Sequence, residues 1–287
     1  MKKYLSLILI CLLVLTGCGK KETSVEVLKK VLTNEKETNS AVVKARVDFK
    51  MEQDGINIDL PLELALSVSM EDEKNGNIHI SLGDNPFIGE LELYAGMKDK
   101  EMTMYMPSAL IDMMAGLEDT ESHWIVQKET LTDDETDKEF SMEEYKQNID
   151  KIMEVVTEED FVFVEEVDSV SHYKLKITAD LIKRISEKME EEYDSSIEDV
   201  LEEPWELDMY SKDYMITKIE LDMTKILTSV MENNSIEEES FNIDMLKKLS
   251  FAIEISEYNE TNVTIPENVK NAAITSEEYL RLYIGEE

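Results

Sequence analysis

The segment between Ile56 and Met70 constrains the fold more than any other part of the chain. Every second residue in these fifteen positions is apolar, and the residues between them are polar, small or Pro61. Such strict alternation is typical of a strand with one face buried and the other in water. At about 3.3 Å per residue the strand would be roughly 50 Å long, and a sheet of such strands twists strongly and curls. Pro61, at an outward position, predicts an edge, a bulge or a bend.

Similar strands are expected on both sides of this segment. Asp54-Gly55 and Asn75-Gly76 are typical hairpin turns. A helix that Ser24 caps comes before the first strand. The first half of the chain therefore predicts a helix and then an antiparallel meander of about five strands. The alternating segments are residues 43–51, 56–70, 78–82, 87–95 and 102–106.

The second half mixes helical spacing with further strands. No Pro-, Gly- or Ser-rich linker divides the chain, so we expect one domain over residues 24–270 and a C-terminal tail over 271–287. The predicted fold class is α+β, built on a long, curved antiparallel sheet. Helices are expected at 110–117, 141–156 and 179–189, and strands at 124–126, 161–167, 172–178, 205–211, 215–223 and 249–255.

The N-terminus has the pattern of an export signal. Two lysines precede an apolar run that is too short to span a bilayer as a permanent helix. The run ends in Leu15-Thr16-Gly17-Cys18, which resembles the lipobox of bacterial lipoproteins. That resemblance implies a signal peptide over residues 1–17, acyl chains on the Cys18 thiol, and a lipidated tether over 18–23. The alternative is an ordinary secretory signal in which Cys18 is incidental.

Cysteine content and charge exclude several kinds of site. The second cysteine, Cys11, lies inside the signal, so the mature chain would have no other thiol for a disulfide, a zinc site or a nucleophile. Removing residues 1–17 takes away two lysines and no acid, so the net charge becomes 27 minus 65, or −38. This charge repels nucleic acids and anionic polymers, and it makes a basic envelope protein one candidate partner. The acidic runs are interpreted as solvated surface, with calcium binding as the less favoured alternative.

The residues show no pattern of a catalytic site. His79, His123 and His172 are widely separated, and none begins a metal-ligand pair at i and i+4. A Gly-x-Ser-x-Gly elbow and a Gly-rich phosphate loop are both missing from the sequence. We therefore expect neither an enzyme, nor a metal site, nor a cofactor.

The order of these elements resembles one known group of proteins. A lipobox, a helix, long strands, helices inserted midway, more strands and an ending of Ile265-Pro266-Glu267-Asn268-Val269 are similar to the lipoprotein-carrier superfamily, which includes LolA, LolB, LppX and LprG. The resemblance implies a half-open barrel with helices across its concave face. It also implies an apolar cavity that accommodates acyl chains.

Leucines and methionines of the long strands and the following helix are the candidate lining of that cavity. Flexible thioethers suit a wall that adapts to acyl chains, although a methionine at strand or helix spacing is also ordinary core. The candidate residues are Leu62, Leu64, Leu66, Met102, Met104, Met106, Met113 and Met114.

Two functional hypotheses remain open at this point. The first is a membrane-anchored, extracytoplasmic lipoprotein, held by the acyl chains on Cys18, that binds a lipid or lipid-linked envelope component as a monomer. The second is a non-catalytic interaction or sensor module with a filled core and an acidic surface for a basic envelope protein. A Gram-positive cell surface is the favoured location. An apolar cavity of several hundred Å³ would favour the first hypothesis, and a solid core the second.

Overall fold

The computed structural model describes residues 22–53, 56–72, 75–85, 89–99, 101–115, 122–130, 142–190, 201, 203–224, 226–228 and 245–283. The predicted signal peptide and the lipidation site Cys18 lie outside these residues and stay predictions. Within the described ranges, no helix is both long enough and apolar enough to cross a membrane.

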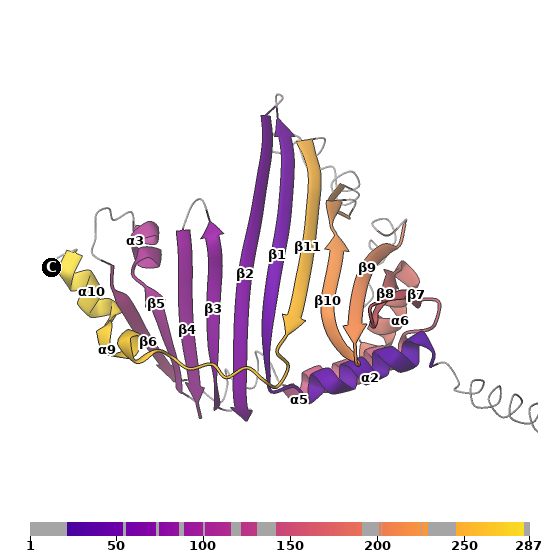
Figure 1. Cartoon of the computed structure of the whole chain (residues 1–287), viewed down its shortest axis with the longest axis horizontal. Helices are drawn as coiled ribbons and strands as arrows, with labels where there is room; N and C mark the ends of the chain where they lie inside the picture. Colours follow the sequence, from indigo (N-terminus) through magenta and orange to yellow (C-terminus); the bar gives the residue numbers. More distant parts are fainter. Residues whose placement is uncertain are drawn as a thin grey trace, which may run out of the picture.

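Twelve strands form a single sheet (Figure 1). Its strand order is β12-β6-β5-β4-β3-β2-β1-β11-β10-β9-β8-β7. The sheet is curved and not closed, which confirms the predicted α+β class and the half-open form. In chain order the strands are β1 (Ser40–Gln53), β2 (Ile56–Asp72), β3 (Asn75–Asn85), β4 (Gly89–Lys98), β5 (Glu101–Pro107), β6 (Trp124–Thr130), β7 (Phe161–Val167), β8 (Val170–Ile177), β9 (Trp205–Lys212), β10 (Met215–Asp222), β11 (Leu246–Ser256) and β12 (Ala273–Thr275).

Helices precede the sheet, interrupt it and follow it. Among those whose bounds are described are α2 (Ser24–Lys36), α3 (Ala109–Ala115), α5 (Met142–Val155), α6 (Ala179–Met189), α9 (Glu267–Ala272) and α10 (Ser276–Tyr283).

The longest strand is the one predicted from strict alternation. β2 has 17 residues and β1 has 14, and they pair from Ser40 opposite Ser69 to Gln53 opposite Ile56. On its other side, β2 pairs with β3 only from Leu64 onward. Pro61 therefore lies where β2 has β1 as its neighbour but not β3. This confirms the expected edge, because proline has no N–H to offer to a ladder.

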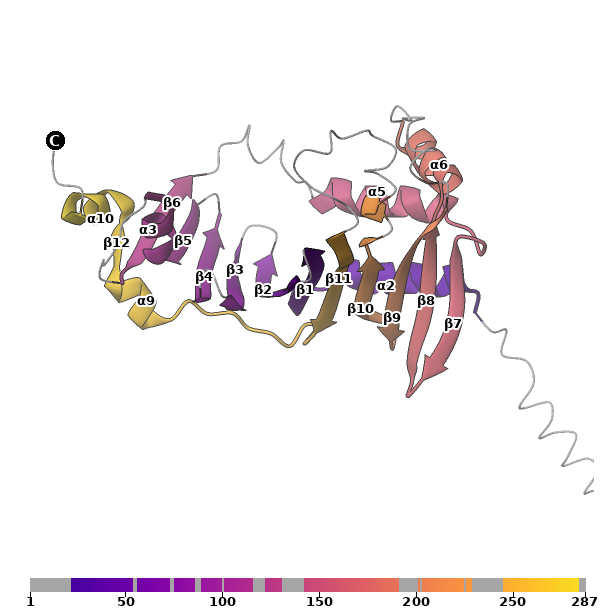
Figure 2. The same ribbon diagram turned by 90° about the horizontal axis from the view of Figure 1, so that it is seen from above.

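Alternation gives the sheet an apolar face and a polar face. The apolar face carries the odd-numbered residues 43–51 of β1 and their cross-strand partners, and the polar face carries the even-numbered residues 44–50 and theirs. Figure 2 shows α5 and α6 on one side of the sheet and residues 257–266 on the other, with β3–β6 bending toward the α5 side. The packing partners of α5 and α6 identify their side as the apolar face.

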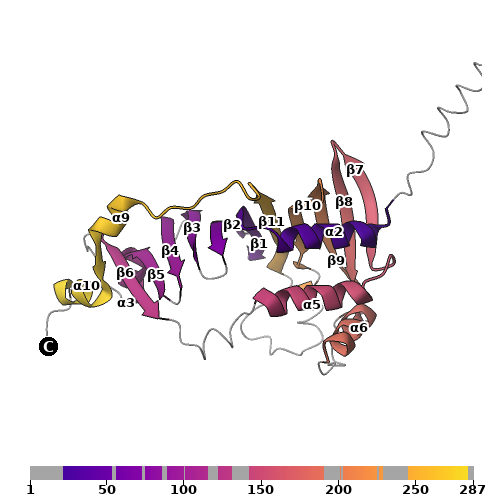
Figure 3. The same cartoon turned by 90° about the horizontal axis from the view of Figure 1, so that it is seen from below.

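The described helices cover one part of the apolar face. Figure 3 shows α2 beneath β8–β10, with α5 and α6 beside it. We call β7–β10 with these three helices the covered half, and β1–β5 the open half. The core of the covered half consists of Leu28 and Val31 from α2, Ile149 and Met153 from α5, Leu181 from α6, and Val156, Phe161, Tyr173, Met209 and Ile216.

A partly buried ion pair joins two elements of the covered half. Arg184 of α6 donates from Nη2 to Asp160 Oδ1 and Oδ2 at 2.8 and 2.9 Å, just before β7. The Asp160 carboxylate also accepts from the N–H and the hydroxyl of Thr157. Burial alone would raise the pKa of Asp160, but these hydrogen bonds outweigh burial and hold the pKa below its usual range.

Both ends of the described chain differ in detail from the sequence analysis. Thr23, not Ser24, caps α2. Its side chain accepts from the N–H of Glu26, and the Glu26 carboxylate accepts from the N–H of Thr23. Residues 271–283, placed beyond the domain from sequence, add β12 in parallel beside β6 and then α10. Tyr279 of α10 is fully buried and donates a hydrogen bond to Asp112. A short parallel strand has too little sequence to show a period, so this edge carries no local signal.

Candidate apolar ligand face

Cross-strand rows bring the predicted cavity residues together. Ala45 lies opposite Leu64, which lies opposite Leu82, which lies opposite Leu91. The next row contains Val43, Leu66, Ile80 and Leu93. The following row runs through Val68, Ile78, Ala95 and Met104. Residues opposite one another in an antiparallel ladder share a face, so the candidates of β2 and β5 belong to one surface.

Six of the eight predicted lining residues lie on this surface. Met102 opposes Met97 and Met106 opposes Ile125, at the same alternation as Met104. For Met113 and Met114 the structure places the backbone in α3, and their side chains lie outside the description. The six residues on the apolar face are Leu62, Leu64, Leu66, Met102, Met104 and Met106.

The apolar face of the open half is only partly covered. Leu62 is 44% exposed and Ile56 is 65% exposed. Most of the other described apolar residues in these rows are half-buried, although Leu91 is buried. Leucine side chains normally lie inside a folded protein, so a run of half-exposed ones marks a surface that something else can cover.

The face is also free of charge. In the three rows described above, no position of β1–β4 carries an ionisable side chain. The neighbouring polar face, by contrast, pairs Lys50 with Asp59 and Arg46 with Glu63 across the same two strands. Alternation therefore separates a surface suited to hydrocarbon from one suited to water.

Sequence reasoning found part of this site. It selected the leucines of β2 and the methionines of β5, but not their neighbours Val43, Ile80 and Leu93. The missed residues carry the same alternation signal, and adding the hairpin registers would have aligned them with Leu66.

The histidines stay apart in space. His172 Nε2 lies 2.7 Å from Asp208 Oδ1, and its ring stacks on Tyr210. His79 stacks on Tyr94, and His123 contacts the ring of Tyr279 edge-on. Among the described residues, no group of three or more His, Cys, Asp or Glu side chains is arranged to hold a metal ion.

Comparisons with known proteins find likeness in fold only. No family model and no curated protein matches the chain. A crystal structure of LprF from Mycobacterium bovis is 10% identical at a TM-score of 0.37, over 85% of this chain and 96% of that one. The lipoprotein LppX from Mycobacterium tuberculosis is 10% identical at a TM-score of 0.34, over 84% and 98%. The LolA superfamily protein NE2245 from Nitrosomonas europaea is 9% identical at 0.21, over 86% and 97%. LppX and the LolA superfamily, both named from the sequence, are thus among the similar structures, but at these scores the function must be inferred from the chain's own residues.

Proposed function

We propose that this chain is a membrane-anchored, extracytoplasmic lipoprotein that binds an apolar ligand on the apolar face of β1–β5. The ligand class is a lipid or a lipid-linked envelope component. One observation carries the proposal: uncharged, half-buried apolar rows continue across the neighbouring strands β1–β4. Such a surface recognises hydrocarbon by area and not by hydrogen bonds.

The dimensions of the open half suit acyl chains. Five strands about 4.8 Å apart span roughly 20 Å, and ten residues along β1 span roughly 33 Å. Fully burying one leucine contributes about 1.5–3 kcal/mol. Covering several half-buried side chains would therefore supply the free energy of a micromolar complex, from which the entropic cost of association is subtracted. Met102 and Met104 add side chains that adapt their shape to the ligand.

The start of the described chain supports a tether at the covered half. The N–H groups of Ser24 and Val25 each donate to the Glu158 carboxylate at 3.0 Å, next to β7. Glu22 accepts from the Tyr214 hydroxyl at 2.9 Å. The proposed tether of residues 18–23 reaches at most about 20 Å when extended, so acyl chains on Cys18 would keep the domain beside the membrane.

A second candidate function rests on the polar face. A cavity of about 730 Å³ there spans β3, β2, β1, β11, β10 and β9. Its acidic residues outnumber its basic ones, which suits a basic envelope protein better than a lipid. The acidic residues are Asp48, Glu63, Asp208, Glu220, Asp222 and Glu254, and the basic ones are Lys44, Arg46, Lys218 and Lys248.

Substitutions on neighbouring positions of β2 separate the two candidates. Leu62→Glu places a charge on the apolar face, while Glu63→Gln changes the polar face one residue away. We expect Leu62→Glu to weaken binding of a pyrene-labelled hexadecanoate by about tenfold or more, because the carboxylate would be buried against hydrocarbon. Glu63→Gln should leave it unchanged.

The measurement uses the mature chain with Cys18 replaced by serine. Native mass spectrometry should find lipid bound to the protein as purified, and fluorescence titration gives the affinity of each variant. Absence of lipid in several preparations together with no probe binding would sink the lipid proposal. Loss of probe binding in Glu63→Gln alone would contradict a lipid site on the apolar face, because it would place the lipid on the polar face.

The anchor has its own test. In the full-length chain Cys18→Ala should move the protein from the membrane fraction to the soluble one, since a chain without acyl groups lacks the hydrophobic attachment. Unchanged membrane retention of this variant would refute lipidation at Cys18.

A further inference from the structure

We infer that the polar face over β3–β6 binds a neutral oligosaccharide along an aromatic groove. This groove lies on the side of the sheet opposite the apolar face. Its aromatic residues His79, Tyr94, Tyr105 and Trp124 lie outside the apolar rows of the proposed lipid site, so either function can hold without the other.

Aromatic rings from four neighbouring strands meet on this part of the polar face. His79 of β3 stacks on Tyr94 of β4, with ring centroids 4.5 Å apart and planes 10° from parallel. Tyr94 lies 5.8 Å from the Trp124 ring of β6 and directly opposite Tyr105 of β5. The Tyr94 hydroxyl donates to Glu92 Oε2 at 3.1 Å. Tyr94 is buried at 9% exposure, so the flat surfaces open to a ligand are those of Tyr105 and Trp124, which each line a hollow.

Two hollows flank this row, one on each side of it along the strands. One has a volume of about 470 Å³ and the other about 480 Å³. In β3, Asn75 and Asn77 line the first, His79 belongs to the aromatic row, and Ser81 and Gly83 line the second. We call the two hollows and the aromatic row between them the aromatic groove. It extends over nine residues of β3, from Asn75 to Gly83, roughly 26 Å.

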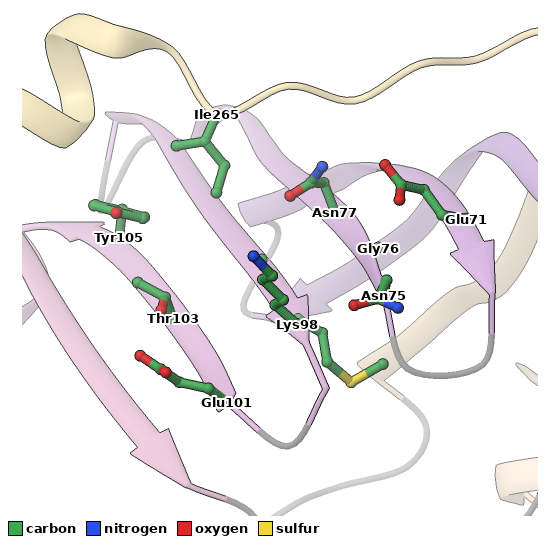
Figure 4. A pocket seen from close by; sticks show the side chains of 11 residues that line it. Glu71, Asn75, Gly76, Asn77, Lys98, Glu101, Thr103, Tyr105 and Ile265 are labelled. Atoms are coloured by element: carbon green, nitrogen blue, oxygen red, sulfur yellow. The ribbon is translucent and has the colours of Figure 1, made fainter.

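Figure 4 shows the first hollow. Tyr105 and Thr103 lie on one side and Asn77 on the other, with Ile265 reaching down between them and Lys98 farther along. Residues 257–266 cross the sheet here, and Asn77 Nδ2 donates to the Val263 carbonyl at 3.1 Å. The segment thus forms a fixed wall of the hollow.

A glycine makes room for that wall. A Cβ added to Gly96 would lie 3.1 Å from both Ile265 Cδ1 and Asn77 Oδ1. Any side chain at this position would therefore push against the wall and the amide that holds it. The hollow depends on the missing side chain of Gly96.

The chemistry of the lining matches a sugar. Pyranose rings present C–H groups on their faces and hydroxyls at their edges, and aromatic rings with polar tips serve both. Lys98, Thr103 and Tyr105 make no hydrogen bond or ion pair with other side chains in the described part of the molecule, so their polar atoms can meet ligand hydroxyls. The formal net charge of −36 disfavours phosphorylated or uronate-rich polymers and leaves neutral glycans.

An extended peptide is the weaker alternative. Peptides that bind sheets usually add a strand at an open edge, where main-chain groups are unpaired. Here β3, β4 and β5 each have a neighbour on both sides, so their main-chain groups are used within the sheet. A ligand on this face must be recognised by side chains alone.

The test measures the fluorescence of Trp124, which lies in the groove. The chain has two tryptophans, so Trp205→Phe leaves Trp124 as the single reporter. Chitohexaose, cellohexaose and maltohexaose are titrated into this form of the mature protein, with polygalacturonate as the charged comparison. We expect a saturable change with at least one neutral hexasaccharide at or below about 1 mM, and none with polygalacturonate.

Variants locate the binding. Tyr105→Ala should weaken it about three- to tenfold through loss of a stacking surface. Tyr210→Ala is the matched control, since Tyr210 is an aromatic residue of the polar face in β9, outside the groove. Circular dichroism melts confirm that both variants fold.

Either of two results with glycans would overturn the inference, and so would one result with a peptide. One is the lack of a saturable response to all three neutral hexasaccharides. The other is an equal loss of affinity in Tyr105→Ala and Tyr210→Ala. Stronger binding of an extended oligoalanine-lysine peptide than of any glycan would assign the groove to peptides and reject the sugar. Unchanged hexadecanoate binding in Leu62→Glu, with glycan binding kept, would contradict the lipid site and leave this inference standing.

Discussion

The open and covered halves of the sheet share one apolar face but differ in what lies on it. A single row of paired residues crosses from one half to the other without interruption. In the covered half Met209 and Tyr173 of this row are only 4% and 5% exposed, whereas Leu64 in the open half is half-buried. The row consists of Leu82, Leu64, Ala45, Ile253, Ile219, Met209 and Tyr173.

This difference separates the part of the surface that stabilises the fold from the part to which we assign the proposed function. The strands of both halves have the same alternation, so the pattern that makes a strand does not decide what covers it. In the covered half, α2, α5 and α6 supply the apolar cover from the chain itself. In the open half the cover is incomplete among the described residues, and a ligand would complete it. Stability should therefore depend mainly on the covered half.

We expect the largest effect on stability from one of a matched pair of phenylalanine truncations. Phe161 in the covered half is 1% exposed and stacks on Tyr173 at 5.0 Å, whereas Phe49 in the open half is half-buried. Phe161→Ala should lower the free energy of unfolding by about 3–5 kcal/mol through lost burial and a cavity, and Phe49→Ala by about 1–2 kcal/mol. Urea unfolding of both variants measures the difference. Equal losses would show that the two halves are packed alike.

The ion pair between Asp160 and Arg184 should come next. Asp160→Asn leaves the partly buried Arg184 with only the exposed carboxylate of Asp180, and we expect a loss of about 2 kcal/mol at pH 7. Because the pKa of Asp160 is lowered in the folded state, its contribution is present above the ordinary value of 3.8 and is lost as the pH falls through the folded pKa. Unfolding curves between pH 7 and pH 3 should therefore converge for wild type and variant.

Asp180→Asn is the control for this pair. Asp180 also accepts from Arg184 Nε at 2.9 Å, but its side chain is 77% exposed. Its removal should cost less than about 0.5 kcal/mol. A loss as large as that of Asp160→Asn would mean that burial is not what makes the first pair matter.

Glu35 should give the opposite pH dependence. Burial raises its pKa, and the Tyr258 hydroxyl lies 2.8 Å from Glu35 Oε1 and 2.7 Å from the Ile216 carbonyl. One phenol proton cannot serve both acceptors, so a proton on Glu35 completes the network. Its contribution is therefore full below the ordinary value of 4.5 and is lost as the pH rises through the folded pKa. Glu35→Gln should gain stability relative to wild type between pH 4 and pH 7, and a parallel pair of curves would contradict this.

Local pattern explains which parts of the fold were predictable. The alternation in β2 identified its length and its two faces, and Pro61 marked the point where β3 no longer accompanies it. The pairing of Val42 with Ser256 was not predictable, because a contact between residues so far apart leaves no local period. The parallel pairing of β12 with β6 was missed for the same reason.

The candidate site was likewise predictable only where a local pattern determines it. That Leu62, Leu64 and Leu66 share one face follows from a period of two. The exposure of these leucines does not follow from the period, because it depends on where α5 and α6 pack. The aromatic groove also needed the register, which alone brings Tyr94 and Tyr105 opposite each other. The sequence thus predicted which residues share a face of the sheet, and the structure showed which strands and helices lie next to that face.

The smallest expected effect on stability concerns the uncovered edge of the open half at Pro61. Pro61→Ala should change the free energy of unfolding by no more than about 1 kcal/mol, because it mainly adds freedom to the unfolded chain. It also adds an N–H to an exposed, apolar segment that lacks β3 as a neighbour, and such edges invite pairing between molecules. Sedimentation velocity should therefore show more self-association in Pro61→Ala, whereas Pro61→Lys should remain as dispersed as wild type, since an edge lysine opposes association. Equal association in both variants would mean that the apolar face itself, and not the edge, joins the molecules, and the open half would then be a surface for a second copy of the chain as well as for lipid.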